Sequence, residues 1–167
     1  MYEERIEKAV DYFKQGYNCS QSVVAAFADL YGIDHNLAVR MAASFGGGIG
    51  RMRQTCGAAC GMFLLAGLET GCTDPSNREG KGANYAVVQQ LAEKFKAENG
   101  TTICAELLGL KPKAPTPTEP EARTAEYYKK RPCVKMVETA ARIFAEFLTE
   151  RQKKNSIGPA QSRPTLH

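Results

Sequence analysis

Hydrophobic residues recur every three or four positions along most of the chain, which is the spacing of helices that bury one face. The first such stripe, which closes at Phe13, predicts a helix over residues 2–15 that Gly16 ends. The same spacing predicts a second helix over residues 20–31 and a third helix that Asp34 caps.

The middle of the chain holds its most apolar stretch. Residues 56–69 are hydrophobic or small on almost every side, which predicts the central helix of the fold, with Thr55 as its cap. A polar loop is expected over residues 71–82, and a fifth helix over residues 83–98. A short helix that carries Cys104 follows.

The C-terminal third is less regular. Four prolines within residues 111–120 predict an irregular segment, and a short helical piece is expected over residues 121–129. Pro132 suits the first position of a last long helix. The chain becomes polar beyond that helix, so we expect one helical domain over residues 1–150 and a disordered tail over residues 151–167.

No stretch alternates β-branched and polar residues in the manner of a strand. The predicted fold class is therefore all-α, a helical bundle of about five main helices with short extra helical segments. The length of 167 residues and the hydrophobic share of 43% suit one domain with its own core. Small helix residues and a thin core suggest that two copies form a homodimer.

The charge pattern narrows the class of partner. The net charge is +4, but Lys and Arg are spread among Asp and Glu, so we expect no nucleic-acid partner. No apolar run reaches the ~18 residues that span a bilayer, so we expect no membrane partner. The charged N-terminus lacks the features of a secretory signal, which predicts a cytoplasmic location, where thiols normally stay reduced.

Four of the six cysteines lie at predicted helix starts: Cys19, Cys56, Cys104 and Cys133. The positive end of the helix dipole and free backbone N–H groups favour thiolate there. A thiolate is both a redox nucleophile and a ligand for soft metals. The four cysteines contain no Cys-x-x-Cys pair, which argues against a zinc ribbon, a thioredoxin motif and a c-type haem site.

The spacing leaves the roles of the cysteines open. Cys60 lies about one helical turn after Cys56, so the two could chelate one metal ion, but Cys60 also suits a small core residue. Cys72 follows Gly71 at a helix end and could simply pack there. For the four cysteines at helix starts, composition and spacing favour a functional role and a packing role about equally.

A glycine run precedes Cys56, and Arg51 and Arg53 follow that run directly. Glycine loops with arginines can cradle phosphate, but such loops usually follow a strand, and here a helix is expected first. We therefore expect a loop that carries its backbone past the cysteine site, where N–H groups could bond sulfur. The glycines expected beside a cofactor are Gly47, Gly48, Gly50 and Gly57.

The sequence after the glycine run resembles the signature of the C_GCAxxG_C_C family, bacterial and archaeal proteins described as redox-active. The Cys-Gly-Ala-x-x-Gly core of that signature is residues 56–61, and the typical Gly-Tyr-Asn-Cys-Ser-Gln turn is residues 16–21. Cys104 and Cys133 stand where the family has its two later cysteines. The resemblance covers about residues 1–150.

This resemblance implies an all-helical fold in which four cysteines are the key residues. It also implies kinship with the domain of split-Soret cytochromes, and hence cluster or electron-transfer chemistry. Cys60 fills a variable position of the signature, and Cys72 is not a signature position. The Cys-x-x-Cys-His needed to attach haem does not occur in the chain, so haem chemistry is not implied.

Three hypotheses follow. In the first, the chain is a redox or electron-transfer protein with an unidentified electron donor or acceptor. Its cysteines bind an iron–sulfur cluster or another soft metal. In a variant of this hypothesis without metal, the cysteines cycle through a disulfide. In the second, zinc holds the helix ends together. In the third, the chain is a helical partner module with cysteines in its core. We favour the first, in which the chain is an oxidoreductase or an electron carrier.

Overall fold

The computed structural model describes residues 1–157, and residues 158–167 lie outside the described part. The described residues form α1 (Glu3–Lys14), α2 (Cys19–Ala25), α3 (His35–Ala42), α4 (Gly57–Thr70), α5 (Arg78–Asn99), α6 (Cys104–Leu107), α7 (Ala125–Lys130) and α8 (Cys133–Ile157). Two 3-10 turns are η1 (Ala28–Tyr31) and η2 (Ala43–Phe45). Apart from one β-bridge, between Thr55 and Ile103, the described part contains no strand pairing, and the all-α prediction is confirmed.

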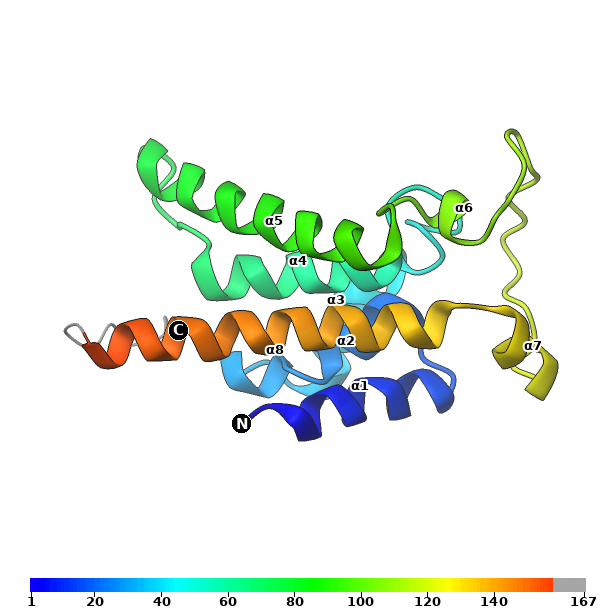
Figure 1. Ribbon diagram of the computed structural model, residues 1–167, viewed down its shortest axis with the longest axis horizontal. Helices are drawn as coiled ribbons and strands as arrows, with labels where there is room; N and C mark the ends of the chain where they lie inside the picture. The colour runs from blue at the N-terminus through cyan, green and yellow to red at the C-terminus, as the bar shows by residue number, and fades with distance from the viewer. Residues whose placement is uncertain (158–167) are drawn as a thin grey trace.

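Two helices form the centre of the bundle (Figure 1). α8 runs along the molecule and packs against α1, α2, α4 and α5, while α4 packs against α2, α5 and α8. Their fully buried side chains include Met62 and Leu65 of α4 and Val137 and Phe144 of α8. α4 is therefore central as predicted, and it shares that position with α8.

The starts of four helices lie at the same end of the bundle, on the right of Figure 1. Cys19 is the first residue of α2, Cys104 of α6 and Cys133 of α8, and Cys56 immediately precedes α4. The chain reverses direction between these helices and so returns to the same end each time. The topology thus collects cysteines that are far apart in the sequence.

Side-chain caps explain where α2 and α3 begin. The Asn18 side chain accepts from the N–H of Gln21 at 2.9 Å, and the Gln21 side chain accepts from the N–H of Asn18 at 3.0 Å. This capping box satisfies two backbone donors and places Cys19 in the first turn of α2. Asp34 caps α3 as predicted, because its carboxylate accepts from the N–H of Leu37 at 2.9 Å.

Some predicted boundaries were wrong. The predicted second helix divides into α2 and η1. Thr55 does not cap α4, because it pairs with Ile103 in the β-bridge. The polar loop before α5 is shorter than predicted, since the Asn77 side chain accepts from the N–H of Gly80 at 2.8 Å and starts the helix at Arg78.

The last helix also extends beyond its predicted end. α8 continues to Ile157, so residues 151–157 are helical and not part of a disordered tail; the rest of the predicted tail lies outside the described residues. Arg151 donates from Nε to the buried carboxylate of Glu69 at 3.0 Å. This tertiary contact stabilises a polar helix end whose own residues give little support.

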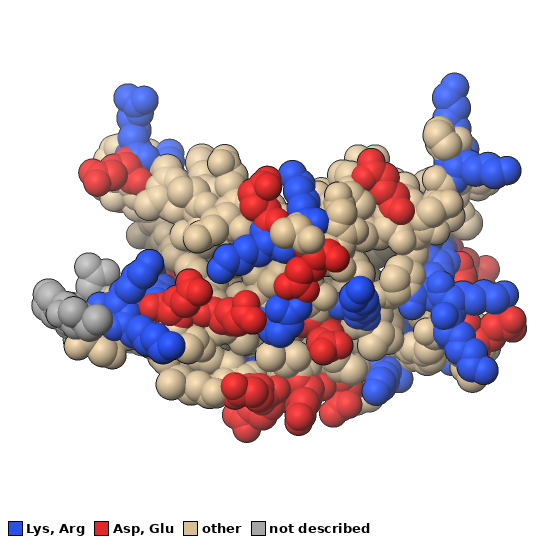
Figure 2. Space-filling view, in the orientation of Figure 1, with Lys and Arg blue, Asp and Glu red and all other residues tan. Residues whose placement is uncertain are grey.

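Acidic and basic side chains are mixed over the visible face of the bundle (Figure 2). Basic side chains gather at the end of the molecule where α7 lies (Figures 1 and 2). None of the described helices combines the length and the hydropathy required to cross a membrane. The homodimer and the cytoplasmic location stay predictions.

Candidate functional site

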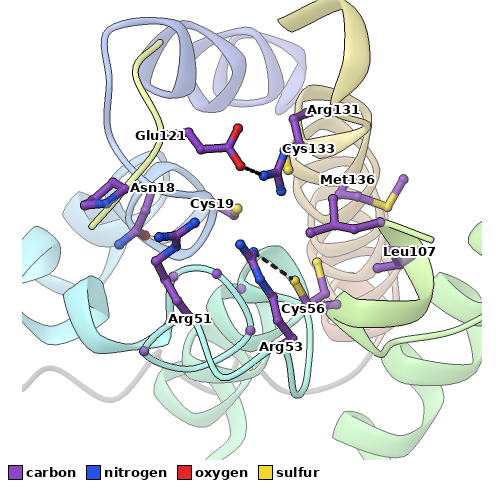
Figure 3. Close-up of a pocket in the computed structure, with 18 of the residues that line it drawn as sticks. Asn18, Cys19, Arg51, Arg53, Cys56, Leu107, Glu121, Arg131, Cys133 and Met136 are labelled. Atoms are coloured by element: carbon purple, nitrogen blue, oxygen red, sulfur yellow. Dashed lines mark hydrogen bonds and ion pairs between the residues drawn. The ribbon is translucent and has the colours of Figure 1, made fainter. Parts of the chain in front are cut away.

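All four cysteines from helix starts line one cavity of about 290 Å³ (Figure 3). They are Cys19, Cys56, Cys104 and Cys133. Figure 3 shows the side chains of Cys19, Cys56 and Cys133 directed toward the same space. The structure therefore brings together the residues that the sequence singles out, although they belong to four different segments.

The glycines expected beside a cofactor also line this cavity: Gly47, Gly48, Gly50 and Gly57. Three of them, Gly47, Gly48 and Gly57, have no room for a side chain. A Cβ at Gly48 would lie 2.6 Å from the Cβ of Cys104, and a Cβ at Gly57 would lie 2.8 Å from the carbonyl oxygen of Phe45. These glycines let the backbone approach the cysteine site closely, as the sequence predicts.

The backbone of the glycine run is left-handed over consecutive residues. The φ angle is 65° at Gly47, 74° at Gly48, 64° at Ile49 and 61° at Arg51. A left-handed conformation costs a non-glycine residue about 1–2 kcal/mol, and a β-branched isoleucine is poorly suited to it. Strain of this kind persists where the surroundings hold it, and it concentrates at functional sites.

Backbone hydrogen bonds tie the end of this loop to the segment around α6. The N–H of Cys104 donates to the carbonyl oxygen of Gln54 at 2.6 Å, and the N–H of Cys56 donates to that of Thr102 at 2.7 Å. These two hydrogen bonds thus fix the backbone positions of both cysteines. This pairing holds the start of α6 beside the start of α4.

Cys19 and Cys133 interact directly. A hydrogen bond from the Cys19 thiol to the sulfur of Cys133 lowers the pKa of Cys133 to about 7, despite burial. The same hydrogen bond, together with burial, raises the pKa of Cys19 well above its usual value. The pair therefore favours the thiolate on Cys133 and the thiol on Cys19.

Three other side chains also favour the thiolate of Cys133. The positive charges of Arg131 and Arg123 and a hydrogen bond from Tyr127 lower its pKa further. Arg123 lies 4.1 Å from the ring centroid of Phe13 and donates to the carbonyl oxygen of Phe13 at 2.9 Å. The contact with the end of α1 therefore holds positive charge beside Cys133.

The prediction that every helix start favours thiolate was wrong for Cys19 and for two further cysteines. Burial raises the pKa of Cys56 to about 12, although the N–H groups of Ala59 and Ala58 bond its sulfur and oppose the shift. Burial also raises the pKa of Cys104, even though Arg53 donates to its sulfur at 3.7 Å. Desolvation of a charged sulfur outweighs the favourable groups at these two positions.

Cys60 and Cys72 do not line the cavity. Cys60 is 7% exposed and donates to the carbonyl oxygen of Thr55 at 3.7 Å, as a packed core thiol would. Burial raises the pKa of Cys60 to about 11. Cys72 is half-buried near the start of α5 and donates to the carbonyl oxygen of Asp74 at 3.7 Å.

The donor set allows a test of which metal group would fit. Within residues 1–157, no three His, Cys, Asp or Glu side chains stand close enough together to hold a metal ion. Four thiols around one cavity are, however, the donor set of a Cys₄ iron–sulfur site. The four thiols have the donor chemistry of such a group and share one cavity, but as they stand the described side chains form no metal site.

The residues that surround Cys133 were missed by sequence reasoning. Arg131 precedes Cys133 by two positions, so the sequence did carry a signal for it. Arg123 and Tyr127 reach the cavity because the segment around α7 packs against the turn after α1, where Arg123 donates to the carbonyl oxygen of Tyr17 at 3.0 Å. No local pattern marks these two residues.

Residues 17–147 match the family model described as "Putative redox-active protein (C_GCAxxG_C_C)". The chain belongs to the C_GCAxxG_C_C family. The matched region includes all four cavity cysteines. No curated protein and no solved structure matches the chain.

Proposed function

We propose that this chain is a thiol–disulfide redox protein whose working pair is Cys19 and Cys133. The observation that carries the proposal is the direct interaction of these two side chains, which lowers the pKa of Cys133 and raises that of Cys19. Disulfide exchange requires a nucleophilic thiolate beside a second thiol that resolves the intermediate. The description of the family as redox-active supports this proposal.

The exchange consists of two balanced steps. First, the Cys133 thiolate attacks one sulfur of a substrate disulfide, so that a mixed disulfide forms and the other half of the substrate leaves as a thiolate. Cys19 then attacks the sulfur of Cys133, and its proton passes to the second half, which leaves as a thiol. The substrate disulfide is reduced, the Cys19–Cys133 disulfide forms, and a dithiol reductant regenerates the pair.

A second candidate is a cluster-bearing electron carrier, and the shared cavity is the observation that favours it. The residues that would hold an iron–sulfur cluster are Cys19, Cys56, Cys104 and Cys133. Such a cluster, when bound, would supply one-electron transfer. The chain itself gathers the four thiols, buries Cys56 and Cys104, and places Arg53 and Arg131 beside them to offset negative charge.

Protein purified without oxygen distinguishes these two candidates. Iron, zinc and acid-labile sulfide are measured together with the visible spectrum. Metal-free protein is then oxidised with a small disulfide and mapped by mass spectrometry. We expect a Cys19–Cys133 disulfide. Cys133→Ser should abolish it, and the matched variant Cys72→Ser should not, because Cys72 lies outside the cavity wall.

Other outcomes would point elsewhere. Iron and sulfide in stoichiometric amounts, lost on substitution of any cavity cysteine, would establish the cluster protein. One zinc per chain whose removal unfolds the protein would establish a structural role for the cysteines. Metal-free protein in which Cys19 and Cys133 never pair would refute the disulfide proposal.

A further inference from the structure

The wall of the cysteine cavity is rich in positive charge. Four arginines line it, namely Arg51, Arg53, Arg123 and Arg131. They face one lining carboxylate, Glu121, which is already paired with Arg131. Lys129 adds charge at the end of α7, where basic side chains gather in Figure 2, and the neighbouring Lys130 is paired with Glu126. Positive charge around a partly closed cavity attracts anions.

Arg53 is the arginine best placed to hold such an anion. Arg51 donates to the carbonyl oxygen of Pro117 at 2.8 Å, and Arg123 donates to two carbonyl oxygens, one in the last turn of α1 and one just after it. Arg53 donates to the sulfur of Cys104 at 3.7 Å and has no ion-pair partner within residues 1–157. Its guanidinium reaches into the central space of Figure 3. A guanidinium has five N–H donors, so it has capacity for a ligand.

The backbone at Arg53 is held in a conformation that arginine does not favour. Its φ angle is 61°. The N–H of Arg53 donates to the carbonyl oxygen of Gly47 at 3.3 Å, and its own carbonyl oxygen accepts from the N–H of Ala105 at 3.2 Å. The surroundings thus impose a left-handed turn that costs about 1–2 kcal/mol. The turn presents this side chain to the cavity.

The size of the cavity limits what can enter. Its volume of about 290 Å³ is just below the ~300–1,000 Å³ typical of pockets that enclose drug-sized ligands. A molecule with a few carbon atoms and two carboxylates fits such a space. Cys133 lines the same wall, so this molecule would lie within reach of the thiolate.

We infer that the cavity binds small disulfides that carry carboxylate groups, and that Arg53 determines this specificity. The inference rests on the proposed exchange at Cys133 and names its substrate class. Arg53 binds a substrate carboxylate through parallel N–H donors, which a planar guanidinium presents in the right geometry. The disulfide bond of the substrate is thereby held close to Cys133.

The products follow from the exchange. When the substrate S–S bond breaks, one mercaptocarboxylate leaves as a thiolate and Cys133 retains the other in a mixed disulfide. The second mercaptocarboxylate then leaves with the proton of Cys19 as a thiol. Two electrons pass from the protein to the substrate, and one disulfide bond forms between Cys19 and Cys133.

Three small disulfides of different charge test the inference: the dianion dithiodiglycolate, neutral bis(2-hydroxyethyl) disulfide and the dication cystamine. The rate constant of each with reduced protein at pH 7 is divided by its rate constant with free 2-mercaptoethanol, which removes differences in intrinsic reactivity. We expect the normalised rate to fall about tenfold from dianion to neutral and again to dication. Added salt should reduce these ratios.

Variants test which residue causes the preference for the dianionic disulfide. Arg53→Asn removes the charge but keeps a residue that tolerates a left-handed backbone, and should lower the ratio of dianion to neutral rates about tenfold. Arg53→Lys should retain part of the preference because the charge remains. Arg78→Asn is the matched control: it removes the same charge at the start of α5, at the opposite end of the bundle (Figure 1), and should keep the original ratio. Circular dichroism checks that each variant is folded.

Binding is measured separately from reaction. Thiodiglycolate is a dicarboxylate thioether that cannot exchange, and calorimetry follows its binding to the Cys133→Ser protein. Saturable binding that Arg53→Asn weakens supports the inference. Equal normalised rates for the three disulfides, with no thiodiglycolate binding, overturn the inference and leave the proposed function standing. If Cys133 reacts with no disulfide, the proposed function fails, and calorimetry alone decides whether the cavity takes carboxylates.

Discussion

Cys56 and Cys133 both stand at the start of a long helix on the same cavity, yet the pKa of Cys56 is raised to about 12 and that of Cys133 is lowered to about 7. Cys56 is 5% exposed, and the groups that favour its thiolate are backbone N–H groups. Cys133 is bonded by the Cys19 thiol and lies near Arg131 and Arg123. The two helix starts share a local structure and differ in their neighbours.

This difference shows what makes a cysteine reactive here. The helix dipole is typically worth about 0.3–1 kcal/mol, whereas full burial can shift a pKa by up to about 3–5 units. A helix start therefore does not produce a thiolate once the sulfur is buried. Side chains that bond or attract the charged sulfur are also required, and Cys133 has them.

The segments that precede α4 and α8 also differ. A strained glycine loop leads into α4 and brings backbone close to the cysteines. Arg131 and Pro132 lead into α8, and both line the cavity. The segment before α4 thus shapes the cavity wall, and the segment before α8 places positive charge on that wall. Three predictions test this division.

The largest expected effect is on thiol reactivity. At pH 7 about half of Cys133 but only about one part in 10⁵ of Cys56 is thiolate, given pKa values of about 7 and about 12. The lower nucleophilicity of a less basic thiolate offsets part of this difference. In reduced, metal-free protein, iodoacetamide should still alkylate Cys133 at least about a hundredfold faster than Cys56. Peptide mass spectrometry of timed samples measures both rates.

The pH dependence of the same reaction adds a second criterion. Because Cys133 reacts as the thiolate, its alkylation rate should rise with pH and reach half its maximum near pH 7. Cys133→Ser should remove the fast reaction, and Cys72→Ser should keep it. Similar rates for Cys56 and Cys133 would show that neighbouring charge does not separate the two helix starts.

The next effect concerns the glycine loop. Gly48→Ala should lower the free energy of unfolding by about 2–4 kcal/mol, because its φ angle of 74° is left-handed and the new Cβ would lie 2.6 Å from that of Cys104. Gly67→Ala in α4 is the matched control, since nothing lies within 4 Å of its Cβ position. It should raise the free energy of unfolding by about 0.5–1 kcal/mol. Urea denaturation measures both, and a neutral Gly48→Ala would contradict the role of the loop.

The smallest effect tests the entry to α8. Arg131→Gln should raise the pKa of Cys133 by about one unit, because the thiolate loses a nearby positive charge. The midpoint of the alkylation profile should move to higher pH accordingly. Lys130→Gln removes an exposed charge that pairs with Glu126 at 3.1 Å, and should leave the midpoint in place. A midpoint that stays in place in Arg131→Gln would assign the shift to Cys19, Tyr127 and Arg123 instead.

Features that depend on a few neighbouring residues could be predicted from the sequence. The cap at Asp34, the apolar stripe of α1 and the position of the cysteines at helix starts are all of this kind. The end of α8 could not be predicted, because Arg151 bonds Glu69 from 82 residues away. The loop before α5 was mistaken for a longer one because the cap of Asn77 was not recognised.

By itself, the sequence determined the helical class, the glycine loop and the four cysteines at helix starts, because helix spacing, capping and backbone freedom act over a few residues. Only the tertiary structure decided that Cys19 meets Cys133 and that the pKa of Cys133 is the one that is lowered. Arg123 takes part in that outcome through a hydrogen bond to Phe13, 110 residues away. Desolvation and charge act through space and not along the chain, so the chemistry of each thiol depends on what the fold places beside it.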